Sequence, residues 1–221
     1  TFDRNVCVPN EMRLMDFSIP QNEATQFMYV LPTATNKALI EMTRFDRTVL
    51  PEELAQHHLK SYLLAMGCGY EINHIERGVI PMSQHVEDHH SDPRVISMGS
   101  RAGKIKSTSG YAFKSMFEHA QELVQDQHPP RLARLSFAQR LPNRFAFYDF
   151  LLLYILKFRP QWGKEIFERL FQKQPAHEVF EFLEERSTLR WEVQMFAKLP
   201  IFKFLWSVLF STISYVFSAP Q

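Results

Sequence analysis

The sequence is poor in glycine and cysteine, and each shortage excludes a class of site. Only 7 of the 221 residues are glycine, and they nowhere form the Gly-X-Gly-X-X-Gly motif that opens a dinucleotide-binding βαβ unit. The nearest approach, Gly67-Cys68-Gly69, lacks the third glycine. The two cysteines, Cys7 and Cys68, have neither disulfide-framework nor metal-ligand spacing, and we interpret them as reduced thiols of a cytoplasmic protein.

Other recurring signals are also missing. No signal peptide is visible, and the chain begins at Thr1 and runs almost at once into strand-like sequence, so we expect a fragment of a longer polypeptide. No helix-turn-helix, zinc-finger or RNA-binding signature accompanies the basic residues, and we expect no nucleic-acid partner. A nucleophile-elbow motif is absent too, which leaves a Ser-His-Asp hydrolase without support.

Phenylalanine is abundant instead, with 20 copies in a chain that is 45% hydrophobic and 22% charged. This composition is that of a globular protein with a large apolar ligand or surface, or with a bulky core. The net charge of +1 conceals a basic middle segment, because residues 101–173 carry 13 basic and 6 acidic side chains. Such a segment could attract a phosphate, a nucleotide or an anionic membrane surface.

The pattern of elements predicts an α+β fold, with an antiparallel sheet first and helices afterwards. A helix should begin at Pro51, with Glu52 and Glu53 at its positive end, and finish at Gly67 or Gly69. Another is expected from about residue 111 to 127, and prolines divide the rest into helices. The expected strands are Met12–Ile19, Gln26–Leu31, Ala38–Phe45, Tyr70–Ile80 and Arg94–Met98.

The turn that follows Met98 is the segment richest in small and hydroxyl residues. Free backbone N–H groups and a helix start near Gly110 favour a phosphate or another anion there, although an ordinary turn is the alternative. Ser107, Thr108 and Ser109 offer hydroxyls and candidate N-caps for the helix.

A series of motifs in fixed order resembles the flavin-dependent lycopene cyclases, which share a fold with geranylgeranyl reductase. The turn, Gly99-Ser100-Arg101-Ala102-Gly103 followed by Ser107-Thr108-Ser109-Gly110-Tyr111, is similar to the second flavin-contacting motif of that family, although Ser107 replaces a proline and Arg101 is bulkier than expected. Further matches are Phe27-Met-Tyr-Val-Leu-Pro32, Ala38-Leu-Ile-Glu-Met-Thr43, Glu76-Arg-Gly-Val-Ile-Pro-Met82, Phe147-Tyr-Asp149, Ile166–Phe171 and Phe182–Ser187.

The resemblance also implies a function for each segment of the chain. Residues 1–93 would form the antiparallel substrate-binding part, 94–128 the carboxyl-terminal flavin-contacting strand, loop and helix, and 129–221 a helical tail. The remainder of the Rossmann-type flavin fold would be missing, so we expect these residues alone to bind flavin poorly and to be inactive. The residues implied to contact FAD are Gly99, Ser100, Arg101, Ala102, Gly103, Ser109, Gly110 and Tyr111, and NADPH would be the reductant.

In this family, ring closure of lycopene or a related acyclic carotene begins with protonation of an alkene by a carboxylic acid. The resemblance places that catalytic acid at Glu41, which is flanked by apolar residues. Without the resemblance, the alternation of the strand favours a carboxylate on its solvated face. The aromatic candidates for the substrate pocket are Phe27, Tyr29 and Phe45, with core packing as the alternative for each, and Pro81 belongs to the same predicted pocket.

The remaining titratable residues have simpler interpretations. His85, His89 and His90 lie in a polar loop without a second ligand set, so no metal is expected. His57 and His58 belong to a polar helix segment and should be exposed. Asp149, inside an apolar run, is either a charge near a helix start or a partner for Arg144.

The carboxyl-terminal segment 199–217 has Lys203 as its only charge. Residues 204–217 would rise only about 21 Å as a helix, which is short of the ~30 Å hydrocarbon core. Lys203, Ser207, Ser211, Ser214 and Ser218 form one narrow polar stripe, which favours a helix in a membrane interface or one packed on a wide apolar face. We therefore expect a cytoplasmic, peripheral membrane protein.

Two rival functions remain open from the sequence. One is another flavin-dependent isoprenoid reductase or monooxygenase, which would not need Glu41. The other is a flavin-free, membrane-associated binding module. The sequence does not specify the oligomeric state, nor whether the ring is of the β or ε type.

Overall fold

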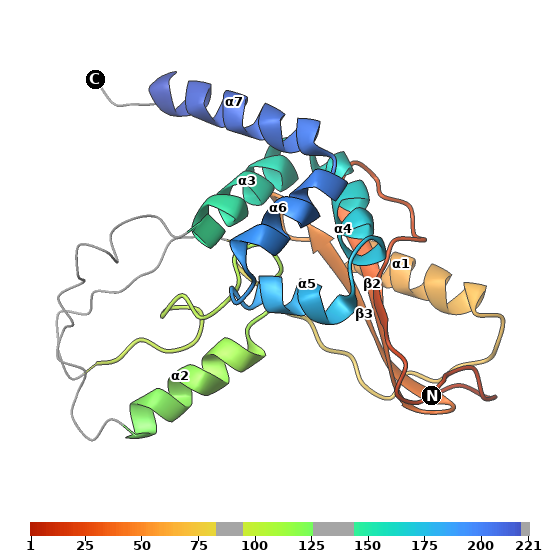
Figure 1. Cartoon of the computed structure of the whole chain (residues 1–221). Helices are drawn as coiled ribbons and strands as arrows, with labels where there is room; N and C mark the ends of the chain where they lie inside the picture. The colour runs from red at the N-terminus through yellow and green to blue at the C-terminus, as the bar shows by residue number, and fades with distance from the viewer. Residues whose placement is uncertain (83–94, 126–143, 218–221) are drawn as a thin grey trace. The chain divides into compact units, whose positions relative to one another are not determined.

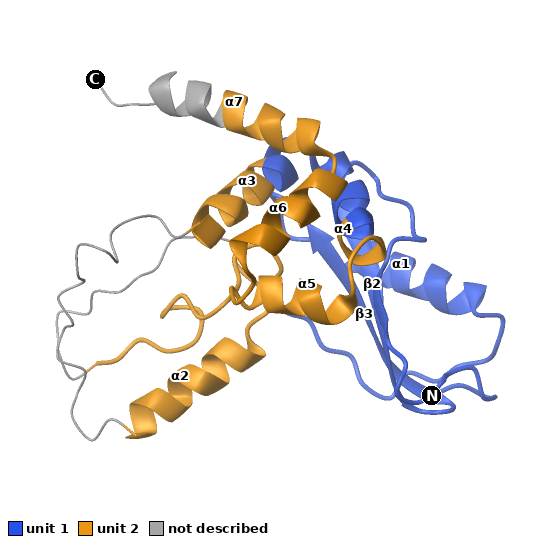
Figure 2. Ribbon diagram, in the orientation of Figure 1, with its two compact units in different colours: residues 1–79, 155–169 blue, residues 80–154, 170–221 orange. Residues whose placement is uncertain are grey.

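A computed structural model describes residues 1–82, 95–125 and 144–217, with side chains as far as Phe210 (Figure 1). It confirms the α+β class, because a small antiparallel sheet comes first and helices follow. The chain divides into two compact units, Thr1–Val79 with Ile155–Arg169, and Ile80–Tyr154 with Leu170–Gln221 (Figure 2). The three-part functional division and the missing flavin-binding remainder stay predictions.

The sheet of the first unit is the meander that the sequence predicts. Its strands β1 (Arg13–Asp16), β2 (Thr25–Ala34) and β3 (Lys37–Phe45) are antiparallel in the order β1-β2-β3. The β2–β3 hairpin pairs Thr25 with Phe45 at one end and Ala34 with Lys37 at the turn. Because side chains alternate along each strand, this register decides which residues share a face.

One face of the sheet packs against helix α1 (Glu52–Ala65). Met28, Val30 and Tyr62 form the buried centre of this layer, together with Ile19. As expected, two glutamates occupy the first turn of α1, and the chain leaves the helix through Gly67, whose φ of +68° is left-handed. The expectation that both histidines of α1 are exposed is wrong for one of them, because His58 is buried and its ring approaches Asn22.

The opposite face is covered at one end by an aromatic core. Phe17 and Phe45 of the strand region contact Phe167 of helix α4 (Gly163–Gln172), and Phe27 lies between Phe17 and Phe45 and contacts both. These ring centroids lie 5.2–6.4 Å apart. The 3₁₀ turn η2 (Pro160–Trp162) packs here as well, since the Thr25 hydroxyl donates to the carbonyl of Pro160 at 2.6 Å. This cover stops short of the hairpin turn.

Two predicted strands do not form. Residues 71–80 have no strand structure, and Tyr70 makes only an isolated bridge with Phe2. Residues 95–98 are likewise irregular, while Arg94 lies outside the described residues. Strand propensity needs a neighbouring strand to pair its backbone, and in the described part of the chain neither segment has one, so Ile75, Val79 and Val95 are exposed.

The second unit is mainly helical. Its core joins Leu170, Val179, Met195 and Leu199. Prolines mark helix boundaries as expected, because Pro175 precedes α5 and Pro200 separates α6 from α7. The start of α6 has in addition a cap that the sequence did not reveal, since the Thr188 hydroxyl accepts from the backbone of this helix. Its elements are α2 (Phe113–Gln125), α5 (Ala176–Leu183), α6 (Leu189–Lys198) and α7 (Ile201–Phe217), while α3 (Arg144–Phe158) and α4 belong partly to each unit.

Candidate functional site

The predicted acid lies on the sheet face that bears the aromatic core, but beyond the end of that cover. Glu41 of β3 pairs with Tyr29 of β2, and the next pair on the same face is Leu39 with Leu31. The two leucines are 48% and 47% exposed. We call the four residues Tyr29, Leu31, Leu39 and Glu41 the acid face. It is an open, mainly apolar surface with one carboxyl group.

The Glu41 carboxylate is exposed and has few partners. The Thr43 hydroxyl donates to its Oε1 at 2.8 Å. Across residues 1–82, where Glu41 itself lies, no ion pair joins it to a lysine or arginine. Burial, and then the negative charge of Glu41, raise the pKa of the Tyr29 phenol to about 12, so that this neighbour is uncharged at neutral pH.

The other predicted pocket residues are placed differently. Phe27 is fully buried and Phe45 nearly so, and their rings meet edge to face at 5.4 Å. Tyr29 continues this row, with its ring 5.1 Å from that of Phe27. The two phenylalanines therefore support the acid face from within the core. Pro81 is exposed and belongs to the second unit.

The predicted flavin-contacting loop is held mainly by its own backbone. Gly99, Gly103 and Gly110 all have left-handed φ values, from +61° to +72°, which glycine adopts without strain. The amides of Gly103 and Gly110 donate to carbonyls within the loop, and that of Tyr111 donates to the Ser109 hydroxyl. These three amides are thus already bonded, and the cofactor assignment stays a prediction.

A buried ion pair fastens this loop to α3. Lys106 Nζ lies 2.9 Å from Asp149 Oδ2 and 2.8 Å from Glu185 Oε1, and the Thr108 hydroxyl donates to Asp149 Oδ1 at 3.0 Å. Burial raises the pKa of Asp149, although Lys106 and Thr108 act in the opposite direction. The partner of Asp149 is therefore Lys106 rather than Arg144, and Thr108 serves this pair instead of capping α2.

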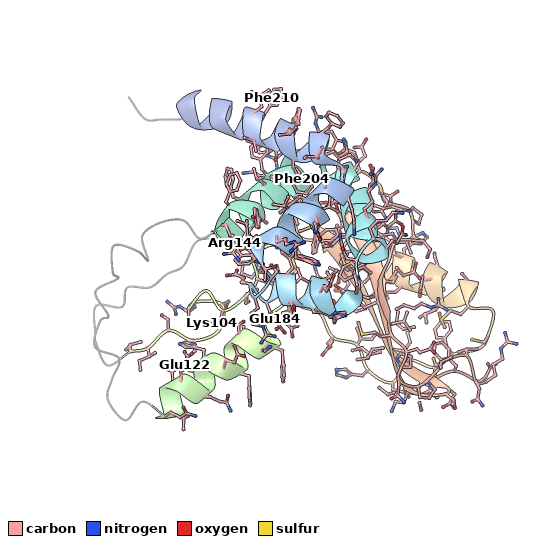
Figure 3. All side chains as sticks on the ribbon, viewed as in Figure 1. Lys104, Glu122, Arg144, Glu184, Phe204 and Phe210 are labelled. Carbon is pink, nitrogen blue, oxygen red and sulfur yellow. The ribbon has the colours of Figure 1, made fainter. Side chains whose placement is uncertain are left out.

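A cavity of about 240 Å³ lies against the same loop. Lys104 and Glu184, both labelled in Figure 3, belong to its lining, with Gly103 and Tyr111 among the others. Glu184 also pairs with Lys114 at 2.7 Å. The volume is below the ~300–1,000 Å³ of typical small-molecule sites, so this cavity could hold only part of a dinucleotide.

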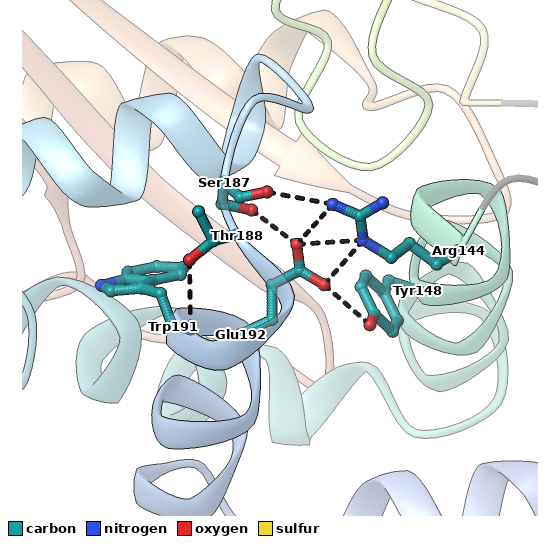
Figure 4. A network of polar contacts seen from close by, with 6 residues as sticks. All are labelled: Arg144, Tyr148, Ser187, Thr188, Trp191 and Glu192. Carbon is teal, nitrogen blue, oxygen red and sulfur yellow. Dashed lines mark hydrogen bonds and ion pairs between the residues drawn. The ribbon is translucent and has the colours of Figure 1, made fainter.

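A second buried network, not predicted from the sequence, joins α3 to α6 (Figure 4). Arg144 Nε donates to both carboxylate oxygens of Glu192, at 3.1 and 2.9 Å, and its Nη2 donates to Glu192 and to the Ser187 carbonyl. The Tyr148 and Ser187 hydroxyls complete the shell at 3.0 and 2.9 Å.

The pKa values of this network indicate a structural role. Burial tends to raise the pKa of Glu192, but the hydrogen bonds from Arg144, Ser187 and Tyr148 outweigh it, so that the pKa is lowered overall. Burial and the bond to Glu192 raise the pKa of Tyr148 to about 12. A carboxylate that is held ionised and fully bonded is a poor proton donor, so we assign this network to stability.

Helix α7 has the reverse of the usual amphipathic arrangement. Ser207, a member of the predicted polar stripe, is fully buried and donates to the Phe204 carbonyl, whereas Phe202 is 83% exposed and Leu205 and Leu209 are also exposed. In Figure 3, Phe204 and Phe210 mark this helix. Within the described ranges, no single helix is long and apolar enough to cross a bilayer; Leu189–Lys198 and Ile201–Phe210 qualify only as a pair, bent by 102°.

Two features bear on what the sequence could reveal. His85, His89 and His90 lie outside the described residues, and the described ranges contain no cluster of three or more His, Cys, Asp or Glu side chains suited to a metal. Thr43 and Leu31 were missed as site residues. The spacing of two along a strand from Glu41 would have identified Thr43, while Leu31 required the hairpin register.

Comparisons with known proteins identify the family of the chain. The lycopene cyclase protein family matches residues 1–208. A lycopene beta-cyclase of Pseudescherichia vulneris is 27% identical over 198 residues, covering 85% of this chain and 44% of that protein. A lycopene beta-cyclase of Paracoccus sp. (strain N81106 / MBIC 01143) is 29% identical over 146 residues, covering 62% and 37%. The chain thus spans less than half the length of either relative, and no solved structure matches it. The match over most of its residues means that the chain belongs to the lycopene cyclase family.

Proposed function

We propose that the protein closes ionone rings at the ends of lycopene, or of a related acyclic carotene, as an intramolecular lyase. The observation that carries this proposal is the position of Glu41, a carboxyl group on an open apolar sheet face that forms no ion pair with the residues that the structure describes. Membership of the lycopene cyclase family supports it. Both relatives named above are lycopene beta-cyclases, which favours the β ring.

Glu41 is the proposed proton donor. Its carboxyl O–H bond breaks as the π electrons of the terminal alkene form a C–H bond, which leaves a tertiary carbocation and a carboxylate. The next double bond then attacks the cation and closes the ring. Loss of one proton from the ring sets the final double bond, so one proton enters, one leaves, and the carotene is isomerised.

The acid face also supplies the environment that this chemistry needs. A hydrocarbon lying over Leu31 and Leu39 would exclude water from Glu41, as the chemistry requires. Tyr29, directly opposite Glu41, is placed to turn an aromatic ring toward the cation, and an aromatic face stabilises positive charge without trapping it. Phe27 packs edge to face against Tyr29 on the same side of the sheet, and Phe45 packs against Phe27 in turn.

FAD is the proposed cofactor, with NADPH keeping it reduced. The left-handed glycines and hydroxyls of residues 99–111 fit close backbone contact with one edge of such a group, and the 240 Å³ cavity beside them fits a portion of it. Gly99, Gly103, Gly110 and Tyr111 are the residues that we expect to touch it. Bound reduced flavin would supply negative charge near a carbocation.

Carotenes are nearly insoluble in water, so the enzyme must collect its substrate from lipid. The exposed apolar side chains of α7, Phe202, Leu205 and Leu209, are suited to rest in the interface of a bilayer, with the buried Ser207 on the protein side. We therefore propose a cytoplasmic protein that associates peripherally with the membrane through the 199–217 segment.

The test is expression of the complete gene in cells that accumulate lycopene, followed by pigment analysis. The expected products carry cyclic ends. Glu41→Gln should lower the rate by about 10²–10⁴-fold, the usual contribution of a general acid, while flavin stays bound. Glu53→Gln on α1 is the matched control, since it neutralises an exposed glutamate on a helix that packs on the other side of the sheet.

Each rival predicts a different result. Unchanged lycopene, with the protein present and flavin bound, would reject the cyclase. Reduced or oxygenated isoprenoids, formed equally by Glu41→Gln, would identify a flavin-dependent reductase or monooxygenase. A protein that binds membranes but no flavin would be the binding module.

A further inference from the structure

The hydrogen bond from Thr43 to Glu41 makes the two carboxyl oxygens of the acid unequal. Residues two apart on a strand point to the same face, and the Thr43 hydroxyl lies 2.8 Å from Oε1 of Glu41. In the described residues, Oε2 has no hydrogen-bond partner, and no cation pairs with either oxygen. One oxygen is therefore held and the other is open.

This asymmetry matters for a proton donor. A neutral carboxyl group carries one proton, and a hydroxyl that donates to Oε1 favours the form in which Oε1 is the carbonyl-type oxygen. The proton then resides on Oε2. Since Glu41 and Thr43 share the face of Tyr29, Leu31 and Leu39, the bond fixes the rotamer of the acid on that face.

We propose that Thr43 is a positioning residue for the acid, which orients Glu41 so that the proton on Oε2 is presented to the alkene of the carotene. This inference rests on the proposed cyclase function. In the protonation step the O–H bond of Oε2 breaks, the alkene takes the proton, and the carboxylate that remains receives the Thr43 hydrogen bond at Oε1. Because a bond to a charged acceptor is stronger than one to a neutral acceptor, Thr43 stabilises the product of proton transfer more than the reactant.

The alternative is that Thr43 is only a good strand residue. It is β-branched, it pairs with Phe27 across the hairpin, and such residues favour strands for their shape alone. Valine has almost the same shape without the hydroxyl, so Thr43→Val separates the two roles. Thr43→Ser keeps the hydroxyl and loses the branch.

The experiment measures kcat and KM of the full-length protein with reduced flavin and lycopene in vesicles. Thr43→Val should lower kcat about ten- to hundredfold, as expected for loss of one hydrogen bond to a charged group, with KM unchanged. The solvent deuterium isotope effect on kcat should rise, because proton transfer becomes slower relative to the other steps. Thr43→Ser should restore most of the rate.

Thr33→Val is the matched control. Thr33 lies at the hairpin end of β2, and its hydroxyl makes only a 3.3 Å contact with the Lys37 carbonyl. The proposal is overturned if Thr43→Val keeps the wild-type rate and isotope effect, if Thr43→Ser is as slow as Thr43→Val, or if Thr33→Val is equally slow. Should Thr43→Val fail to bind flavin or to fold, Thr43→Ala replaces it with the same expectations. A wild-type protein that forms no cyclic carotene would instead reject the proposed function.

Discussion

Two glutamates, one in each unit, show opposite ways of using a carboxyl group. Glu192 of the second unit is fully buried, and Arg144, Tyr148 and Ser187 all donate to it. Glu41 of the first unit is exposed, and Thr43 donates to one of its oxygens. The buried carboxylate has the stronger bonds, but the open one retains the capacity for chemistry.

The comparison shows that burial by itself does not identify a reactive acid. Complete hydrogen bonding holds Glu192 ionised and lowers its pKa, and the same bonds stabilise the contact between α3 and α6. An acid that must give up a proton to a hydrocarbon needs an incompletely bonded oxygen and a surface on which the hydrocarbon can lie. The acid face provides both.

The largest effect on stability should come from breaking the network of the second unit. Glu192→Ala leaves the donors of Arg144, Tyr148 and the buried Ser187 without their shared acceptor, and one buried unsatisfied group alone costs about 1–3 kcal/mol. Chemical denaturation should show a much lower midpoint for Glu192→Ala than for Glu181→Ala, which removes an exposed glutamate of α5. Equal midpoints would contradict the structural assignment of the network.

A smaller effect is expected at the ion pair beneath the loop. Lys106→Met leaves Asp149 buried without its cation and should destabilise the protein by about 1–3 kcal/mol at neutral pH. Burial already raises the pKa of Asp149 in the fold above its value in the unfolded chain, so acid favours the folded state, and removing Lys106 raises that pKa further. The loss of stability caused by Lys106→Met should therefore become smaller as the pH falls through the raised pKa of Asp149.

Asp149→Asn provides the control for this pair. An asparagine can still accept from Thr108 but carries no charge, so the double variant Lys106→Met with Asp149→Asn should be more stable at neutral pH than Lys106→Met alone. If the loss of stability in Lys106→Met does not depend on pH, the substitution removes packing contacts and not a charge interaction.

The smallest effect on stability is expected at the proposed acid itself. Glu41→Gln removes a charge from an exposed position that has no ion pair in the described parts of the chain, so the free energy of unfolding should change by less than about 0.5 kcal/mol. Chemical denaturation of Glu41→Gln and of Glu192→Ala under the same conditions measures the difference between their free energies of unfolding. If Glu41→Gln lost as much stability as Glu192→Ala, Glu41 would be a structural residue, and the two glutamates would not differ in role.

Much of the first unit could be predicted because its signals are local. Alternation and turn residues identified the three strands, and Pro51, Glu52 and Gly67 identified the bounds of α1. The predicted strand at 70–80 failed because pairing is not a local property, and its apolar residues gave no information about a partner strand. His58 was misplaced for a related reason, since its burial depends on what lies beside α1.

The site was predicted in part. The family motifs pointed to Glu41, and the structure places Tyr29 directly across from it. No sequence pattern predicts that Leu31 and Leu39 are exposed while Phe27 and Phe45 are buried. That difference depends on how far α4 and η2 extend over the sheet. The Arg144–Glu192 pair was equally invisible, since 48 residues separate its members.

The contact between Thr25 and Gly163 restricts which substitutions this protein can accept. A Cβ on residue 163 would overlap the buried Thr25 side chain, whose hydroxyl holds the Pro160 carbonyl. Alanine at 163 would therefore overpack this core, and shortening Thr25 to alanine would not relieve it, because the Cβ of residue 25 itself would lie 2.8 Å from the new one. Glycine should therefore be kept at 163 among relatives that keep this end of the sheet, and a redesign of either residue has to treat the two positions as one unit.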